Sequence, residues 1–234
     1  MIIALWGNGG VGKTTLAVHL AKVFSKKEKV LIISGSITHC GVRNWFGCLG
    51  NDKSLTKIIR NIDTFKKNIE TTKFKNIDFT DVSIEENCIT NSKVEDKQII
   101  DLLNISNNLY DIVIIDCHVS FRNLITKNAL LNCDHILYIL SPSLKSLSFY
   151  KSHKILFEKL NLENKTNYII NKDSNQISTK VLEEKMGFEI LSKIKYEKSF
   201  QYASLHGDLL SNRSAKKYYK NLSQVAEEIS EYNE

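Results

Sequence analysis

The sequence is poor in the features that mark linkers, disulfide frameworks and membrane spans. It contains one proline, Pro142, so proline-rich segments are excluded. No apolar run approaches the roughly 18 residues that a membrane-crossing helix needs, and the first residues lack the basic leader of a secretory signal. The five cysteines show no C-x-x-C spacing, which argues against a disulfide framework and against a structural metal. These absences predict a cytoplasmic protein.

Length and charge limit the architecture and the partners. The chain has 234 residues, of which 42% are hydrophobic, enough for one sizeable core and too few for two comfortable domains. We therefore expect a single domain over residues 1–234. The net charge is +6, with basic clusters at 26–29, 193–198 and 213–220. This charge permits contact with nucleic acid, but a solvated basic surface explains it equally well.

Strand and helix patterns alternate along the chain. Short Val/Ile-rich runs without polar alternation are typical of strands buried on both faces, and these alternate with helical spacing of apolar residues. The pattern predicts an α/β fold: a doubly wound, mostly parallel sheet flanked by helices. Strands are expected at 2–6, 30–33, 77–82, 112–115, 136–140 and 168–170. Helices are expected at 14–26, 54–62, 94–103 and 146–160, and helical spacing recurs near the carboxyl end.

The most specific motif directly follows the first expected strand. It fits the phosphate-binding pattern G-x-x-x-x-G-K-[ST] in full, with Gly7, Asn8, Gly9, Gly10, Val11, Gly12, Lys13 and Thr14. Glycines allow a tight turn whose N–H groups point at phosphate oxygens, and the next helix adds the positive end of its dipole. Lys13 is expected to reach the β- and γ-phosphates and Thr14 to bind Mg²⁺.

A second magnesium-binding residue is expected at the end of another buried strand. Residues 110–116 read YDIVIID, an apolar run that ends in Asp116. A carboxylate at the carboxyl edge of a sheet, beside the loop, can hold Mg²⁺ through a water molecule. Asp111 precedes the strand and is expected at the surface. We therefore assign the metal site to Thr14 and Asp116.

These motifs together resemble the ParA/MinD-type deviant Walker A ATPases, a P-loop family that includes the TadZ/CpaE-like pilus-assembly proteins. Residues 9–15 read GGVGKTT, the family's loop, which adds Thr15 to the expected nucleotide-binding residues. The 110–116 segment is similar to the family's YDxVIID, and weaker likenesses at 128–143 and 194–208 follow in family order. The resemblance implies ATP and Mg²⁺ as ligands. Asn171 lies where the family has its adenine-contacting asparagine.

Three departures from the family pattern concern hydrolysis. The family's signature lysine, which reaches the nucleotide of the partner subunit, is replaced by Asn8. The Asp-x-Asp that ends its second strand, and whose second acid orients the attacking water, is Ser34-Gly35-Ser36 here. The switch after Asp116 reads Cys117-His118, where His118 is either a substitute polar group or a histidine without a catalytic role. Binding is expected to survive, and hydrolysis to be slow or absent.

Two functions remain open. The first is an ATP-dependent homodimer, with nucleotide at its interface and Asn8 hydrogen-bonded across it, that helps a protein partner to localise or assemble a pilus, secretion or conjugation machine. The second is a partitioning ATPase that binds DNA non-specifically, which the lysine clusters favour. A metabolic P-loop enzyme is disfavoured because the sequence offers no cluster-ligand cysteines and no room for a substrate domain. Membrane binding is disfavoured because glutamates crowd the carboxyl-terminal helix.

Overall fold

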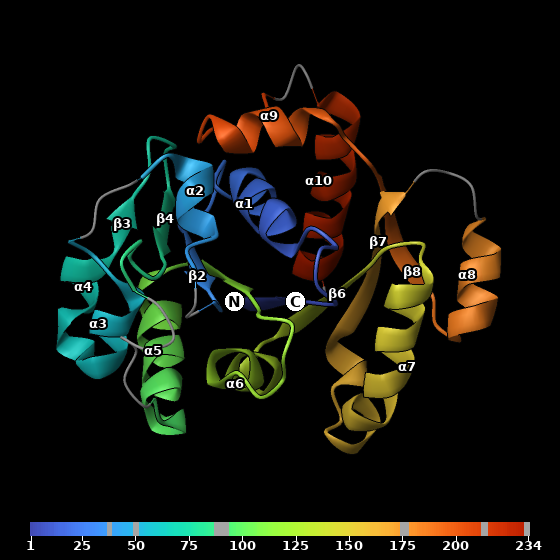
Figure 1. Cartoon of the computed structure of the whole chain (residues 1–234), viewed down its shortest axis with the longest axis horizontal. Coiled ribbons are helices and arrows are strands. Elements are labelled where there is room, and N and C mark those ends of the chain that lie inside the picture. The colour runs from blue at the N-terminus through green and yellow to red at the C-terminus, as the bar shows by residue number, and fades with distance from the viewer. Residues whose placement is uncertain (37–38, 49–51, 87–93, 174–177, 212–214, 232–234) are drawn as a thin grey trace.

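Runs of β-branched residues form the centre of a mainly parallel sheet with helices on both faces (Figure 1). The computed structural model describes residues 1–36, 39–48, 52–86, 94–173, 178–211 and 215–231. In these ranges the strands are β1 (Ile2–Trp6), β2 (Val30–Ser34), β3 (Glu70–Thr71), β4 (Ile77–Thr80), β5 (Ile112–Asp116), β6 (His135–Leu140), β7 (Thr166–Asp173) and β8 (Ile190–Lys195).

The helices lie in the connections between the strands, except the last two, which follow β8. They are α1 (Lys13–Phe24), α2 (Val42–Phe46), α3 (Leu55–Arg60), α4 (Phe65–Asn68), α5 (Asp96–Leu109), α6 (Leu124–Asn132), α7 (Leu144–Lys159), α8 (Thr179–Met186), α9 (Ser199–Leu205) and α10 (Lys216–Glu231), with 3₁₀ turns at Ile62–Thr64 and Glu163–Lys165. The α/β doubly wound fold predicted from the alternating pattern is confirmed.

The order of the strands places the functional segments next to one another. The sheet runs β3-β4-β2-β5-β1-β6-β7-β8, and every pairing except β3 with β4 is parallel. The carboxyl ends of β2, β5, β1, β6 and β7 therefore meet at one edge of the sheet. Ligands of open α/β sheets bind at this edge, and each sequence-predicted site residue lies near or just beyond the carboxyl end of one of these strands.

Alternate strand residues enter two separate hydrophobic cores. In β1, Ile3 and Leu5 pack with α1 and α10, whereas Ala4 and Trp6 pack with the helices of the opposite face. Both sets are fully buried. This two-sided burial is the physical reason why the strands read as continuous apolar runs rather than as alternating ones.

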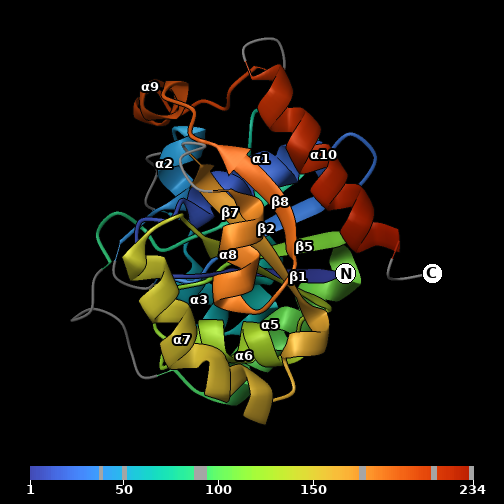
Figure 2. The ribbon, with the colours of Figure 1, turned by 90° about the vertical axis from the view of Figure 1, so that its right-hand side faces the viewer.

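The carboxyl-terminal helix α10 is part of the first core. Tyr218, Leu222, Val225 and Ile229, whose spacing predicted a helix, are buried, and α10 packs on α1 and β8 (Figures 1 and 2). Over the described ranges, the chain contains no helix that is long and apolar enough to cross a membrane.

Several elements differ from the sequence-based prediction. The expected strand at 168–170 is longer, and Asn171 lies inside β7 rather than after it. The pattern also missed β3, β8, α2, α6, α8 and α9. Most of these elements are short or only half-buried, so they lack the strong apolar periodicity on which the prediction depended.

Candidate nucleotide-binding site

The phosphate loop connects β1 to α1, and its glycines are required by close contacts. Gly7 has φ 152°, and a Cβ there would lie 2.0 Å from the Ile139 carbonyl oxygen. Gly12 has φ 93°, and its Cβ would lie 2.6 Å from Asn171 Nδ2. A Cβ on Gly9, in contrast, would meet no atom within 4 Å. The loop thus packs tightly against β6 at Gly7 and against β7 at Gly12, which only glycine permits at these two residues.

The carbonyl groups of the loop accept hydrogen bonds from lysine and asparagine side chains and from the backbone of α1. Lys13 Nζ donates to Gly7 O at 3.1 Å and to Asn8 O at 3.4 Å. The next three carbonyls accept from Lys145, Lys172 and Asn171, and the Gly12 carbonyl accepts from Leu16 N in α1. With its carbonyls committed to these donors, the loop has its N–H groups left to bind an anion. This arrangement fits a nucleotide polyphosphate.

Thr14 and Asp116 meet at the inner side of the loop. Thr14 Oγ1 donates to Asp116 Oδ2 at 2.5 Å, although 102 residues separate them in the chain. Burial raises the pKa of Asp116 to about 6, while Thr14 and Lys13 act in the opposite direction. Burial likewise lowers the pKa of Lys13. A hydroxyl and a carboxylate side by side are oxygen ligands of the kind that Mg²⁺ prefers.

A cavity of about 160 Å³ continues the site beyond the end of the loop. Gly12, Thr15, Asn171 and Tyr196 are among the residues that line it. Asn171 is 6% exposed, and its Nδ2 donates to Val11 O at 2.7 Å, so the amide both supports the loop and faces the cavity. The position fits a nucleoside whose phosphates lie in the loop.

The Asn8 side chain makes its hydrogen bonds within this single chain. Asn8 is 3% exposed, its Oδ1 accepts from Ser146 Oγ at 2.7 Å, and its Nδ2 donates to Gly9 O at 3.2 Å. The hydrogen bond of Asn8 across a dimer interface stays a prediction.

The segments that replace the family's catalytic acid and switch pack closely against Asp116. Gly35 N donates to Asp116 O at 2.8 Å, and a Cβ on Gly35 would lie 2.7 Å from the same oxygen. The His118 carbonyl accepts from Trp6 Nε1 at 3.1 Å, and its Nδ1 accepts from Ser120 N at 3.1 Å. Burial, Lys13 and His39 lower the pKa of His118, which favours its neutral form.

Sequence reasoning missed a second buried carboxylate, Asp81, which follows β4. Asp81 is 0% exposed and accepts from the backbone N–H groups of Gly41, Arg43 and Val82 at 2.8–3.0 Å. Its charge helps to raise the pKa of Asp116. Through the Gly41 and Arg43 amides, Asp81 fixes the start of α2. The signal in the sequence that could have indicated Asp81 was its place near the end of the strand expected at 77–82.

The structure brings together every residue that was assigned to the site from the sequence. The loop residues 7–14, Thr15, Asn171 and Asp116 converge at the edge formed by β5, β1, β6 and β7. Lys145, Ser146 and Lys172, which were not assigned to the site from the sequence, contact the same loop. A P-loop between the central strand and α1, with a carboxylate on the adjacent strand, defines a P-loop nucleotide-binding protein.

Comparisons with known proteins narrow this class. Residues 1–172 match the family described as AAA domain. An uncharacterized ATP-binding protein of Methanocaldococcus jannaschii is 23% identical over 257 residues, covering 98% of both chains. The septum site-determining protein MinD of Pyrococcus horikoshii OT3, solved with Mg-ADP, superimposes with a TM-score of 0.81 at 20% identity, covering 97% of this chain and 95% of its own. A ParA family ATPase from Chlorobium tepidum TLS superimposes with a TM-score of 0.81 at 19% identity, covering 96% of this chain and 98% of its own.

The chain belongs to the AAA domain family, because the match covers well over half of its length. Its fold is that of the MinD and ParA family ATPases named above, in agreement with the resemblance in its loop and Asp116 segments.

Proposed function

We propose that the protein is an ATP- and Mg²⁺-binding dimerisation switch with slow or absent hydrolysis. The observation that carries the proposal is the intact Thr14–Asp116 contact beside a complete phosphate loop, next to altered residues at positions 8 and 36. The binding elements are present, whereas the residues tied to hydrolysis in the family are exchanged. Such a site favours a long-lived nucleotide complex over rapid turnover.

The residues present fit ATP and Mg²⁺. The loop offers its amides and Lys13 to the phosphates, and the Thr14 hydroxyl and Asp116 carboxylate offer oxygen to the metal. Bound Mg²⁺ would supply the positive charge that neutralises the β- and γ-phosphate oxygens. Because burial holds the pKa of Asp116 at about 6, a cation beside it would also stabilise the ionised carboxylate.

Asn171 supports adenine over guanine. Its Nδ2 donates one hydrogen to Val11 O, and we assign the contact with the base to Oδ1. An amide oxygen accepts from the adenine amino group but repels the guanine carbonyl oxygen. The chain therefore prefers ATP to GTP, and tighter binding of GTP in a competition assay would reverse this assignment.

Two substitutions account for slow hydrolysis. Ser36 offers no carboxylate to orient the attacking water, and the loss of such a group typically lowers the rate of hydrolysis by a factor of about 10²–10⁴. Asn8 is neutral and buried, so it supplies no cation to the nucleotide of a partner subunit. The loss of such a cation can lower the rate of hydrolysis by a factor of about 10³–10⁵. Neither loss affects the carbonyl contacts that shape the loop.

The cellular role follows from this slow turnover. A stable ATP-bound homodimer is suited to recruiting a protein partner and to localising or assembling a larger machine in the cytoplasm, such as a pilus, secretion or conjugation apparatus. The TadZ/CpaE-like branch fits this role, because a scaffold does not need repeated hydrolysis.

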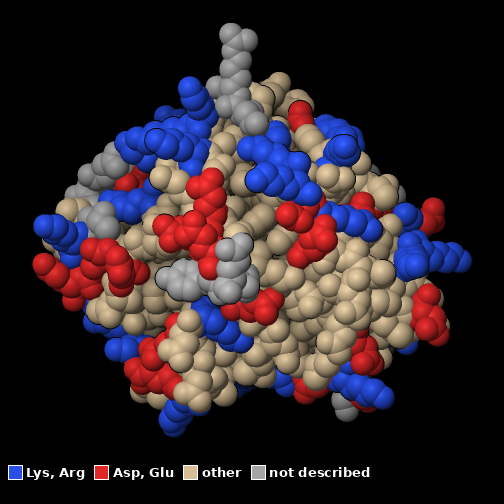
Figure 3. Space-filling model, turned by 180° about the vertical axis from the view of Figure 1, so that it is seen from behind, with Lys and Arg blue, Asp and Glu red and all other residues tan. Residues whose placement is uncertain are grey.

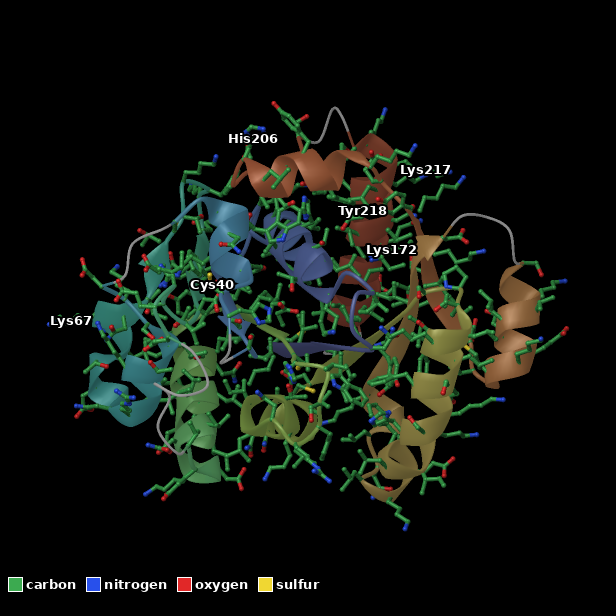
Figure 4. All side chains as sticks on the ribbon, in the orientation of Figure 1. Cys40, Lys67, Lys172, His206, Lys217 and Tyr218 are labelled. Carbon is green, nitrogen blue, oxygen red and sulfur yellow. The ribbon has the colours of Figure 1, made fainter. Side chains whose placement is uncertain are left out.

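A DNA-partitioning function is the second candidate, favoured by the placement of lysines on α10. Lys216, Lys217 and Lys220 are exposed at the amino-terminal end of this helix, where the helix dipole disfavours positive charge (Figure 4 labels Lys217). However, the face opposite to the view of Figure 1 shows basic and acidic side chains interspersed (Figure 3). DNA binding that rises with ATP and falls steeply with salt would favour partitioning.

Sedimentation and phosphate release test the proposed switch. We expect wild-type protein with ATP and Mg²⁺ to sediment as a dimer, to return toward monomer with ADP, and to release phosphate far more slowly than ordinary P-loop ATPases. A monomer at saturating ATP would remove the switch, and brisk turnover would show that positions 8 and 36 do not silence the site.

A further inference from the structure

Two exposed lysines from different parts of the chain contact the rim of the phosphate loop. Lys145, in the first turn of α7, places Nζ 3.4 Å from Gly9 O. Lys172, in β7, places Nζ 2.6 Å from Gly10 O, and Figure 4 shows it in the region between α1 and β7. Both side chains are exposed at the surface. Neither is part of the phosphate-binding motif.

Each lysine stands at a position that costs stability. Lys145 lies in the first turn of a 16-residue helix, where the helix dipole disfavours a cation. Lys172 has φ 58°, a left-handed conformation that is unfavourable for residues other than glycine. The neighbouring register of β7 and β8 is irregular between Ile170 and Asp173, which accommodates this turn of the backbone. At each of these unfavourable positions, the lysine places its ammonium group against a carbonyl of the loop.

Asn8 explains how Lys145 reaches the loop. Ser146 donates to Asn8 Oδ1 at 2.7 Å and fixes the start of α7 against the loop, so the adjacent Lys145 is carried to Gly9. The residue that replaces the family's signature lysine therefore anchors the helix that brings another lysine to the same rim.

The cavity distinguishes the two ends of the bound nucleotide. Lys172 lines this cavity together with Gly12 and Asn171, so it lies at the nucleoside end. Lys145 contacts the loop at Gly9, and neither of these residues is among those that line the cavity. An ammonium at Gly9 is thus positioned for the terminal phosphate, whereas one at Gly10 is positioned for the phosphate nearer the sugar.

We propose that Lys145 supplies, within the same chain, the terminal-phosphate cation that residue 8 has lost, and that Lys172 is its counterpart at the nucleoside end. The assignment rests on the proposed ATP-binding function. Without nucleotide both ammonium groups satisfy loop carbonyls, and with nucleotide they turn to phosphate oxygens, which are stronger, charge-assisted acceptors. Lys145 accordingly distinguishes ATP from ADP, and Lys172 contributes equally to both.

Calorimetric titration of ATP–Mg²⁺ and ADP–Mg²⁺ into four proteins tests the assignment: wild type, Lys145→Ala, Lys172→Ala and Lys151→Ala. The control, Lys151, is an exposed lysine of the same helix, α7. We expect Lys145→Ala to weaken ATP about tenfold, or about 1.4 kcal/mol, with little change for ADP. Lys172→Ala should weaken both nucleotides by a similar factor, and Lys151→Ala neither. Lys145→Arg should restore the ATP preference.

The outcomes separate this inference from the function on which it rests. If wild-type protein binds neither nucleotide, the proposed function itself fails. If it binds ATP but Lys145→Ala leaves the ratio of ATP to ADP affinity unchanged, only the role of Lys145 is overturned. An effect that disappears when the protein is diluted to monomer would overturn the same-chain assignment. Unfolding measured without nucleotide identifies a merely structural role, since that role would lower stability and leave the ATP-to-ADP ratio intact.

Discussion

Ser146 in α7 donates its hydroxyl hydrogen to Asn8 Oδ1 in the phosphate loop, 138 residues earlier in the chain, at 2.7 Å. Ser146 is also fully buried, and its oxygen accepts from Ser141 N at 3.0 Å. One hydroxyl therefore connects the loop after β1, the end of β6 and the start of α7. This connection determines where Asn8 points and where Lys145 lies.

Removing this hydroxyl should lower stability. Ser146→Ala leaves the Asn8 oxygen and the Ser141 amide without a buried partner, and we expect a loss of about 1–3 kcal/mol. Ser152→Ala, at an exposed position of α7, is the matched control and should change stability by less than about 0.5 kcal/mol. Urea unfolding of both variants measures the difference. Equal stability of the two variants would show that the Ser146 contact does not hold α7 to the loop.

Restoring the family residues should raise turnover. In Asn8→Lys with Ser36→Asp, one substitution returns the signature cation and the other returns the acid that the family has after its second strand. We expect phosphate release to increase by about tenfold or more, a part of what such groups contribute elsewhere. Each single variant is the control for the pair. If the double variant remains as slow as wild type, the exchanges at positions 8 and 36 are not what limits hydrolysis.

Alanine substitutions should show which loop glycines are required by close contact with neighbouring backbone and which are not. Gly7→Ala places a methyl group 2.0 Å from the Ile139 carbonyl oxygen, so we expect about 2–4 kcal/mol of destabilisation. Gly9→Ala meets no atom within 4 Å and should change stability by less than about 0.5 kcal/mol without nucleotide. Thermal and urea unfolding provide the comparison. Similar losses for both variants would contradict the described path of the loop.

His19 should make stability depend on pH. It is fully buried, contacts Thr15 O through Nδ1 at 2.8 Å, and lies against Trp45, Phe200 and Tyr218. Burial lowers its pKa to about 4 from 6.5, so between these values the unfolded chain binds a proton that the folded chain does not. This contribution to stability is present above pH 6.5 and decreases as the pH falls toward 4. Between pH 7 and pH 5 the loss is about 2 kcal/mol.

The comparison with His19→Gln isolates this effect. Asp116 acts in the opposite sense, because its raised pKa favours the folded state at acid pH. Asp116 is present in both proteins, whereas only wild type has His19. Wild type should therefore lose more stability than the variant when urea unfolding is repeated at pH 5. Parallel pH profiles for the two proteins would show that His19 does not carry the predicted dependence.

The sequence predicted the parts of the site that depend on local pattern. The loop motif, the strand ending in Asp116 and the α/β layering all follow from contiguous residues, and the fold was predictable for that reason. The positions of Asn8, Lys145 and Lys172 depend instead on contacts between segments more than 130 residues apart. Spacing within a segment contains no information about which carbonyl a distant lysine will reach.

The extent of β7 shows the same limit. Asn171 was expected after a three-residue strand, but β7 continues through Asp173, because β8 pairs with its far side. Strand β8 itself is only partly buried and mixes lysine and serine with apolar residues, so its residue pattern contains no clear strand signal. A strand that pairs with an unrecognised neighbour cannot be bounded from its own pattern.

Calorimetric titration of ATP–Mg²⁺ into wild-type protein and Lys13→Ala tests the central claim most directly. Lys13 is the cation of the loop, and removing a charge from a buried ionic contact typically costs about a hundredfold or more in affinity. The account predicts saturable binding of one ATP per chain to wild type and a loss of about that size in the variant. Equal affinity of the two proteins for ATP would contradict it.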